Sequence, residues 1–451
     1  MTQNLYYSTN HKAPEVSLAE ALINGQAPDR GLYMPRVIPQ VDKKAIENLR
    51  HLTYPEIAAF VIGQFSGDTF SRGLLLNLCK DAYDYEVPLE PVVDRHYVMR
   101  LDQGPTASFK DFAARMMARM FGMLMQQEHR ELVILTATSG DTGSAIAHAF
   151  FEIPNIQVMV LFPPDEVSNR QRKQMTTLGH NITTVAVDGQ FDDCQALVKR
   201  AFADKNLKSI PLTSANSINI GRLLPQIVYY FYAYVRLSKK DEPVTICVPS
   251  GNFGNMMGAL LAKHMGLPIE KLVIATNSND EVPIYLQSGI YQKIVPSRVC
   301  MSNAMNVGHP SNFARVIDLY GGWIDESGKI HKQPDLNRLR HDIWAISISE
   351  EETRTVIKEA WQKHKLLLEP HGAVGWAGLN HYIQKEKAKG LMVTVETAHP
   401  AKFPDEIEAL LHFTPDVPQS LIDVEKKEEH YLKLPADYSA FSDLLIKQYS
   451  R

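Results

Sequence analysis

From about Leu132 onward, short runs of apolar, mostly β-branched residues alternate with longer segments of helical periodicity. The short runs cover residues 132–135, 158–162, 182–187, 244–248, 272–276 and 392–395. Their continuous apolar character is typical of parallel strands that are buried on both faces. The segments between them, such as 113–124, place apolar residues along one helix face. The pattern predicts an α/β fold with open, mostly parallel sheets, in which ligands bind beyond the carboxyl ends of the strands.

The length of 451 residues predicts more than one domain. Residues 1–95 are less regular and rich in turn signals, so we expect a separate amino-terminal domain there. Residues 96–215 and 216–451 are expected to form two α/β regions with the ligand in the cleft between them.

The composition excludes several classes of protein. A formal charge of −4, with 47 Lys and Arg spread along the chain, gives no basic surface for nucleic acid. No apolar run approaches the roughly 20 residues that span a bilayer, and the amino terminus lacks a secretion signal. We therefore expect a cytoplasmic protein with reduced thiols and no membrane partner. The four cysteines are far apart in the sequence: Cys79, Cys194, Cys247 and Cys300.

Lys110 lies in the segment SFKDF, residues 108–112, at the start of a helical run. In isolation such a lysine would be read as a surface residue. Partial burial and the positive field of a helix amino terminus would both lower its pKa and give a neutral, nucleophilic amine. An amine of this kind forms Schiff bases with carbonyl compounds.

A glycine-rich loop, PSGNFGN at residues 249–255, follows a predicted strand and precedes a predicted helix. Backbone N–H groups that open a helix bind phosphate, although a tight turn alone would also require glycine. A reactive lysine together with a phosphate-binding loop predicts pyridoxal phosphate as the cofactor. The predicted loop ligands are Gly251, Asn252, Phe253, Gly254 and Asn255.

Two further polar segments follow predicted strands. At residues 138–143, TSGDTG, the amides and hydroxyls at a helix start predict a carboxylate site, with ordinary helix capping as the alternative. The segment SANSINIGR at 214–222 offers amides and a guanidinium suited to a second phosphate. The candidate substrate ligands in these two segments are Ser139, Asp141, Thr142, Ser214, Asn216, Ser217, Asn219 and Arg222.

Other catalytic chemistries lack their motifs. His371 and His399 stand beside Pro or Gly, without an HExxH pair or a nearby set of carboxylates, so no metal site is expected. No Gly-x-Ser-x-Gly motif surrounds Ser144, so the sequence gives no support for a serine hydrolase.

Four segments, taken in chain order, resemble the threonine synthase family. They are SFKDF at 108–112, TSGDTG at 138–143, PSGNFG at 249–254 and ETAHPAKF at 396–403. Residues 7–9 and 27–35 also resemble the amino-terminal domain that separates this family from other tryptophan-synthase-like, fold-type-II pyridoxal enzymes. The resemblance covers nearly the whole chain, whereas residues 303–313 depart from the family segment.

The resemblance implies roles for individual residues. Lys110 would carry the internal aldimine, and residues 251–255 would hold the cofactor phosphate. Phe109 and Asn252 would flank the cofactor ring, and Thr397 would face the pyridine nitrogen. Residues 139–142 would bind the substrate carboxylate, with the segment 214–222 at the substrate phosphate.

The implied reaction converts O-phospho-L-homoserine and water into L-threonine and phosphate by γ-elimination and β-addition. We expect a monomer or a homodimer and no activator site. A related phospho-lyase, which would release 2-oxobutyrate before water adds, remains an alternative. Serine or threonine dehydration is disfavoured because no regulatory domain is recognised. A pyridoxal-binding scaffold without catalysis would not need Lys110 and the substrate loops together.

Overall fold

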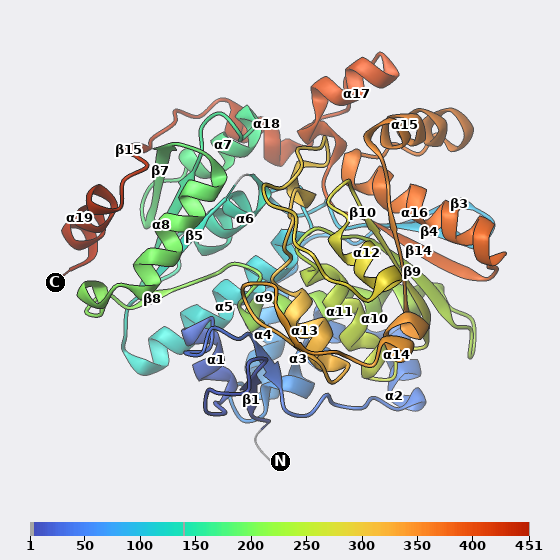
Figure 1. The fold of residues 1–451 in the computed structure, drawn as a ribbon, viewed down its shortest axis with the longest axis horizontal. Coiled ribbons are helices and arrows are strands. Elements are labelled where there is room, and N and C mark those ends of the chain that lie inside the picture. The colour runs from blue at the N-terminus through green and yellow to red at the C-terminus, as the bar shows by residue number, and fades with distance from the viewer. Residues whose placement is uncertain (1–3, 139, 451) are drawn as a thin grey trace.

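The computed structural model describes residues 4–138 and 140–450. Two parallel sheets form its centre, and helices cover them (Figure 1). The larger sheet has the strand order β13-β10-β9-β14-β4-β3, in which only the pair β3–β4 is antiparallel. Its strands are β3 (Leu89–Val93), β4 (His96–Arg100), β9 (Val244–Pro249), β10 (Ile269–Thr276), β13 (Ile343–Ser347) and β14 (Leu391–Glu396).

The smaller sheet is wholly parallel, with the strand order β15-β7-β6-β5-β8. Its strands are β5 (Leu132–Ala137), β6 (Ile156–Phe162), β7 (Ile182–Asp188), β8 (Leu212–Thr213) and β15 (Leu432–Pro435). The predicted α/β fold with mostly parallel sheets is confirmed.

Both sheets bury their two faces, which explains the apolar runs in the sequence. In β9, Ile246 packs into a core that contains residues of α11 (Gly254–His264), whereas Cys247 packs into a core that contains residues of α16 (Pro370–Glu386). On the smaller sheet, α6 (Asp141–Phe150) and α8 (Phe191–Ala203) contribute to different cores in the same way. Alternate side chains of one strand therefore serve opposite helical layers.

The remaining helices surround these layers. These helices include α5 (Lys110–Glu128), α7 (Asn169–Thr176), α9 (Ile220–Leu223), α10 (Pro225–Leu237), α12 (Glu281–Ser288), α13 (Phe313–Leu319), α14 (Leu336–Asp342), α15 (Glu350–His364) and α17 (Pro404–Leu411). The predicted helix over 113–124 lies within α5, where Met116, Met117 and Met120 are fully buried. These methionines are core residues.

The amino-terminal part is built from short elements. They are β1 (Tyr6–Ser8), α1 (Leu18–Asn24), β2 (Tyr33–Pro35), α2 (Lys43–Asn48), α3 (Tyr54–Ser66) and α4 (Arg72–Ala82). β1 and β2 form an antiparallel pair, and a second such pair joins β11 (Trp323–Ile324) to β12 (Ile330–Lys332). The buried guanidinium of Arg315 donates from Nε to the Tyr33 carbonyl at 3.2 Å, which connects this part to α13.

Strand pairing does not follow the three consecutive ranges expected from the sequence. β4, at the start of the expected first α/β region, pairs with β14 in the larger sheet. β15, near the end of the expected second region, pairs with β7 in the smaller sheet.

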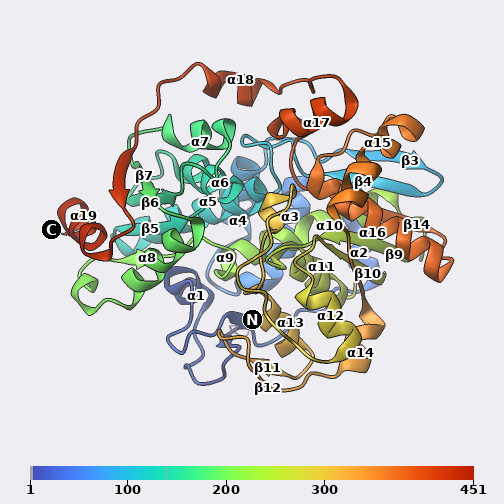
Figure 2. The ribbon, with the colours of Figure 1, turned by 45° about the horizontal axis from the view of Figure 1, so that its top comes forward.

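The carboxyl-terminal segment runs from α17 over α7 through α18 (Gln419–Glu425) to β15 and α19 (Tyr438–Tyr449) (Figure 2). Ion pairs join it to α7: Arg170 Nε lies 2.6 Å from Glu425 Oε1, and Arg172 Nε lies 2.8 Å from Glu429 Oε2. This segment connects elements that pack on different sheets.

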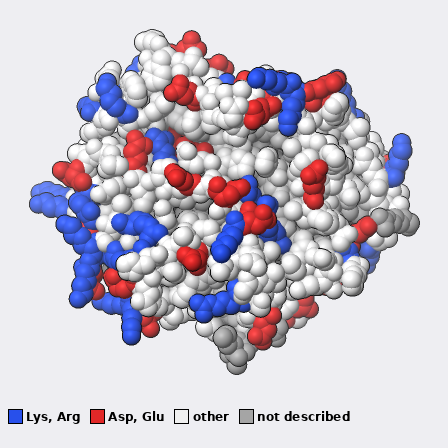
Figure 3. All heavy atoms as spheres, turned by 180° about the vertical axis from the view of Figure 1, so that it is seen from behind, with Lys and Arg blue, Asp and Glu red and all other residues white. Residues whose placement is uncertain are grey.

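Basic and acidic side chains are mixed over the face drawn in Figure 3, with some Lys and Arg gathered at its left edge. All four cysteines are buried and free. Within residues 4–138 and 140–450, no helix combines the length and apolar character needed to cross a membrane.

Candidate active site

The carboxyl ends of the two sheets meet at one buried ion pair. Lys402 follows β14 of the larger sheet, and Asp141 begins α6 directly after β5 of the smaller sheet. The Lys402 Nζ lies 2.6 Å from Asp141 Oδ1, and both side chains are almost completely buried. The segments 138–143 and 396–403, in which the sequence predicted ligands, therefore meet.

Lys110 is the first residue of α5, and backbone contacts fix its position. The Phe109 N–H donates to the Thr397 carbonyl at 2.9 Å, which places the start of α5 beside the residue predicted to face the cofactor ring nitrogen. The Asp111 carboxylate accepts hydrogen bonds from the Thr106 N–H at 2.9 Å and the Thr106 hydroxyl at 2.6 Å. The turn that presents Lys110 is thus held on both sides.

The surroundings of Lys110 favour its neutral form. Burial lowers the pKa of the Lys110 amine to about 8, and the positive charges of Lys402 and Arg222 act in the same direction, whereas Asp141 opposes them. Among the described residues, its Nζ has no hydrogen-bond or ion-pair partner. Its Nζ lies 5.7 Å from the centroid of the Phe109 ring. A neutral amine without a partner is suited to nucleophilic attack.

The glycine-rich loop after β9 opens α11 without a side-chain cap. Phe253 has φ 61° at the N-cap position, and the first intrahelical bond runs from the Met257 N–H to its carbonyl at 3.0 Å. The amides of the first turn are therefore available to an anion. Asn255 adds a donor, because its Nδ2 is buried without a hydrogen-bond partner among the described residues.

Asn252 joins two segments predicted separately. Its Nδ2 donates to the Ser217 Oγ at 2.6 Å, and its Oδ1 accepts hydrogen bonds from the Ser311 N–H at 2.7 Å and the Ser311 hydroxyl at 2.9 Å. Residues 303–313, which depart from the family segment, therefore contribute Ser311 to this region.

In the carboxylate loop, Ser139 lies outside the described residues, and Thr142 is half-buried at the start of α6. The Asp141 side chain contacts Lys402 and Gln171. Its Oδ1 forms the ion pair with Lys402 and accepts a hydrogen bond from Gln171 Nε2 at 2.9 Å. Burial raises the pKa of this carboxyl, but Lys402 and Lys110 together hold it well below its usual range. The Asp141 side chain is thus already paired, and its role as a ligand of the substrate carboxylate stays a prediction.

The segment 214–222 contains both engaged and free groups. The Asn219 amide donates to the Leu22 carbonyl at 2.9 Å and the Ser214 carbonyl at 3.0 Å, and its Oδ1 accepts the Gly221 N–H. Asn219 is fully buried, and both polar atoms of its side chain already form hydrogen bonds. Its side chain therefore has no free group for the predicted role as a substrate ligand. Asn216 Oδ1 accepts the Thr136 hydroxyl at 2.5 Å.

Arg222 keeps a free donor. Its Nη1 donates to the Ala215 carbonyl at 2.9 Å, while its Nε is buried without a partner and no carboxylate among the described residues forms an ion pair with it. Burial lowers the pKa of this guanidinium to about 10. An unpaired buried cation of this kind favours an anionic ligand.

Thr397 follows β14 and donates its hydroxyl to Glu369 Oε1 at 3.4 Å. Glu369 is fully buried and caps α16 by accepting the N–H groups of His371 and Gly372. Behind it lies Glu396, whose pKa is raised well above its usual range by burial and by Glu369. The sequence predicted Thr397 but missed this support, because His371 was considered only as a metal ligand.

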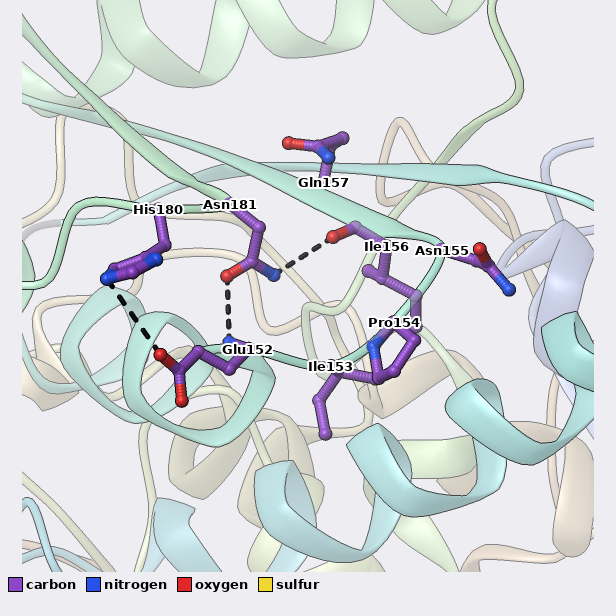
Figure 4. A pocket seen from close by; sticks show the side chains of 8 residues that line it. All are labelled: Glu152, Ile153, Pro154, Asn155, Ile156, Gln157, His180 and Asn181. Atoms are coloured by element: carbon purple, nitrogen blue, oxygen red, sulfur yellow. Dashed lines mark hydrogen bonds and ion pairs between the residues drawn. The ribbon is translucent and has the colours of Figure 1, made fainter.

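A hollow at the other end of the smaller sheet is separate from this region (Figure 4). Its lining includes Glu152, Ile156, His180 and Asn181, near the amino end of β6. It shares no residue with the loops at the carboxyl ends of the strands. Among the described residues, no group of three His, Cys, Asp or Glu is arranged to hold a metal ion.

Lys110 and the loop after β9 fit pyridoxal phosphate. The cofactor needs an amine for its aldehyde and donors for its phosphate. Lys110 Nζ is unpartnered among the described residues, and the uncapped α11 with the orphaned Asn255 Nδ2 supplies donors. The lack of a Cβ at Gly251 lets this loop pack closely on the turn at Met305, since a Cβ there would lie 2.8 Å from the Met305 Cα.

Comparisons with known proteins agree over almost the whole chain. A family model described as "Pyridoxal-phosphate dependent enzyme" matches residues 90–397. The models "Threonine synthase N terminus" and "Threonine synthase, C-terminal" match residues 5–83 and 372–445.

Individual proteins give the same result. Threonine synthase of Haemophilus influenzae is 40% identical over 419 residues, which cover 92% of this chain and 93% of that protein. The crystal structure of threonine synthase from Escherichia coli matches with a TM-score of 0.88 and 36% identity, covering 98% of this chain and 99% of that one. A structure of PLP-bound threonine synthase from Brucella melitensis matches with a TM-score of 0.92 and 34% identity, covering 99% and 100%. This chain therefore belongs to the threonine synthase family of pyridoxal-phosphate-dependent, fold-type-II enzymes.

Proposed function

We propose that this chain converts O-phospho-L-homoserine and water into L-threonine and phosphate at the site around Lys110. Membership of the threonine synthase family supports the reaction class, that of a pyridoxal-phosphate-dependent lyase. The proposal of a phosphorylated substrate rests on Arg222, because the buried Nε of this residue has no partner among the described residues. Its charge also reaches Lys110, where it lowers the pKa of the amine.

Most of the candidate residues have a proposed place. The proposed cofactor ligands are Lys110 at its aldehyde carbon, Gly251, Asn252, Phe253, Gly254 and Asn255 toward its phosphate, Phe109 and Asn252 beside its ring, and Thr397 at its ring nitrogen. Thr142 and the amides that open α6 are proposed for the substrate carboxylate, together with Ser139. Arg222, Ser214, Asn216 and Ser217 are proposed for the substrate phosphate.

The reaction requires proton transfers at two neighbouring carbons. Pyridoxal phosphate, when bound, supplies an electron sink that stabilises negative charge at the α-carbon of the substrate. Lys110 would act as the base at both carbons: its neutral amine would accept the α-proton and, after giving that proton up, would accept a β-proton. Arg222 receives the phosphate as the Cγ–O bond breaks. The oxygen of a water would then bond to Cβ as one of its protons is removed. Of the three protons taken from Cα, Cβ and water, one would go to Cγ, which becomes the methyl group, one to Cα and one to the departing phosphate.

The lowered pKa of Lys110 suits this work. A lysine of ordinary pKa would be protonated near neutrality and unable to accept a proton. At a pKa of about 8 a useful fraction of the Lys110 amine is neutral.

Product identification tests the proposed function. Purified, cofactor-loaded protein is mixed with O-phospho-L-homoserine, and phosphate, threonine and 2-oxobutyrate are measured in the same sample. Threonine equal to phosphate is the expected result. Phosphate matched by 2-oxobutyrate would assign a phospho-lyase instead, and the absence of phosphate release would contradict the proposed substrate.

We also propose that the protein works in the cytoplasm as a monomer or homodimer. Light scattering coupled to size-exclusion chromatography would test the oligomeric state, and a larger assembly would contradict it.

A further inference from the structure

A short 3₁₀ helix, Asn303–Met305, packs against the proposed cofactor-phosphate loop. A Cβ added at Gly251 would lie 2.8 Å from the Met305 Cα and 3.0 Å from the Ala304 carbonyl oxygen. The Gly251 backbone therefore rests directly on this turn, and a shift of the turn moves the loop.

A hydrogen bond also ties this turn to His371. The Ala304 N–H donates to His371 Nε2 at 3.0 Å. A backbone N–H can only donate, so Nε2 must accept and the ring proton lies on Nδ1. That Nδ1 lies 2.5 Å from Glu369 Oε2, which accepts its hydrogen. His371 is 3% exposed, so water does not replace either contact easily.

Glu369 connects this contact to the other end of the cofactor site. Its Oε1 accepts the Gly372 N–H at 3.0 Å and the Thr397 hydroxyl at 3.4 Å. Its own N–H donates to Glu396 Oε1 at 2.9 Å. One set of hydrogen bonds therefore runs from Thr397 through Glu369 and His371 to the turn beneath Gly251.

We propose that His371 is a positioning residue for the cofactor: by accepting the Ala304 N–H, it fixes the turn Asn303–Met305 and thereby the Gly251 backbone. The inference rests on the proposed role of residues 251–255 as the cofactor-phosphate loop. Phosphate donors act over a narrow range of distances, so a displacement of well under an ångström weakens binding.

The side chain of Asn277 also anchors the turn. Asn277 Nδ2 donates to the Ser302 Oγ at 3.1 Å and to Asn306 Oδ1 at 3.0 Å, on either side of the turn. These contacts hold its ends, whereas His371 contacts its centre. Loss of His371 should therefore move the turn without unfolding it.

Two substitutions separate the two ring nitrogens. His371→Asn places its polar atoms near the position of Nδ1 and loses the acceptor for Ala304. His371→Gln reaches the position of Nε2 and keeps an acceptor there. His381→Asn is the matched control, because His381 is also on α16 and its Nε2 lies 2.5 Å from Glu352 Oε1 in a partly exposed pair.

The measurement is the dissociation constant of pyridoxal phosphate, from fluorescence titration of each apoprotein. We expect His371→Asn to raise it about tenfold, the scale of one lost supporting hydrogen bond. His371→Gln should stay within about threefold of the parent and His381→Asn should match it. The ³¹P resonance of the bound cofactor should move in His371→Asn and remain in place in His381→Asn.

Several results would overturn the proposal. They are a parent-like dissociation constant in His371→Asn, equal weakening in both His371 variants, or the same loss in His381→Asn. If His371→Asn does not fold, His371→Ala, which also removes the acceptor for Ala304, takes its place: a tenfold loss of affinity beside a parent-like His371→Gln supports the proposal, and parent-like affinity rejects it. No substrate is used, so failure of the threonine reaction would leave this result unchanged, whereas a parent protein that binds no cofactor would reject the proposed function itself.

Discussion

Lys402 and Asp141 form a buried ion pair, 2.6 Å from Nζ to Oδ1, that joins the carboxyl ends of the two sheets. Lys402 Nζ also donates to the Thr106 carbonyl at 2.8 Å, in the segment that leads to Lys110. The pair thus connects three loops of the site. Its charges also act in opposite directions on the pKa of Lys110.

Replacing Lys402 by Met should destabilise the protein, because the buried Asp141 carboxylate would lose its partner. We expect the free energy of unfolding to fall by about 3–5 kcal/mol. Urea denaturation of the apoprotein measures it. The double variant Asp141→Asn, Lys402→Met should recover part of the loss, and the exposed pair of Lys363 with Glu359 supplies the control Lys363→Met. Unchanged stability in Lys402→Met would contradict this role.

Lys110→Ala should lower turnover by at least about 10³-fold, because the site loses both its covalent attachment and its base. Borohydride reduction of the loaded parent should leave the cofactor on the peptide that contains Lys110. Mass spectrometry of the digested protein checks this assignment. Label on the peptide of Lys402 instead would show that the wrong lysine has been chosen.

The pH dependence of reconstitution should report the lowered pKa of Lys110. A lysine amine attacks an aldehyde only when it is neutral. The rate of pyridoxal phosphate incorporation into the apoprotein should therefore rise through a midpoint near the pKa of about 8 and level off above it. Stopped-flow absorbance from pH 6 to 10 measures this rate. A midpoint near the ordinary lysine value, roughly 10.4, would contradict the burial of the amine.

Arg222→Lys should weaken use of the phosphorylated substrate more than binding of the cofactor. A lost hydrogen bond to a charged group corresponds to a fall in kcat/KM of about 10- to 100-fold. Steady-state kinetics with cofactor titration separates the two effects. The exposed Arg36, paired with Glu15, gives the control Arg36→Lys. An equal loss of cofactor affinity would place Arg222 at the cofactor phosphate.

Gly251→Ala should weaken cofactor binding about tenfold, because the new methyl group would displace the Met305 backbone rather than a flexible side chain. Titration of the apoprotein with pyridoxal phosphate measures the effect. Gly73→Ala is the control, since a Cβ at Gly73 meets no atom within 4 Å. Equal affinity in Gly251→Ala and the parent would show that this contact can relax.

The sequence predicted the strands that are buried on both faces. It missed the edge strands β3, β8, β13 and β15 and also β4, which is interior to its sheet but only partly buried. Continuous apolar runs correspond to β5, β6, β7, β9, β10 and β14. β15, which reads Leu-Lys-Leu-Pro, is largely exposed, so its pattern carries no comparable signal. Its pairing with β7 depends on tertiary contact between distant segments.

The same distinction applies to the site. Lys110 and the glycine-rich loop were recognisable because the signal for each comes from neighbouring residues in the sequence, at the start of a helix. The supporting contacts of His371 with Ala304 and of Lys402 with Asp141 join residues far apart in the chain. Only the folded structure brings these side chains together, and it also reveals that Asn219 and Asp141 are already engaged.

The pairing of β7 with β15 also constrains the order in which the molecule assembles. During synthesis, β7 leaves the ribosome well before β15 has been made, because residues 189–431 lie between them. Until then the smaller sheet has an open hydrogen-bonding edge, a feature that promotes pairing with other chains. β15 therefore pairs with an edge of the smaller sheet that stays open while residues 189–431 are being made.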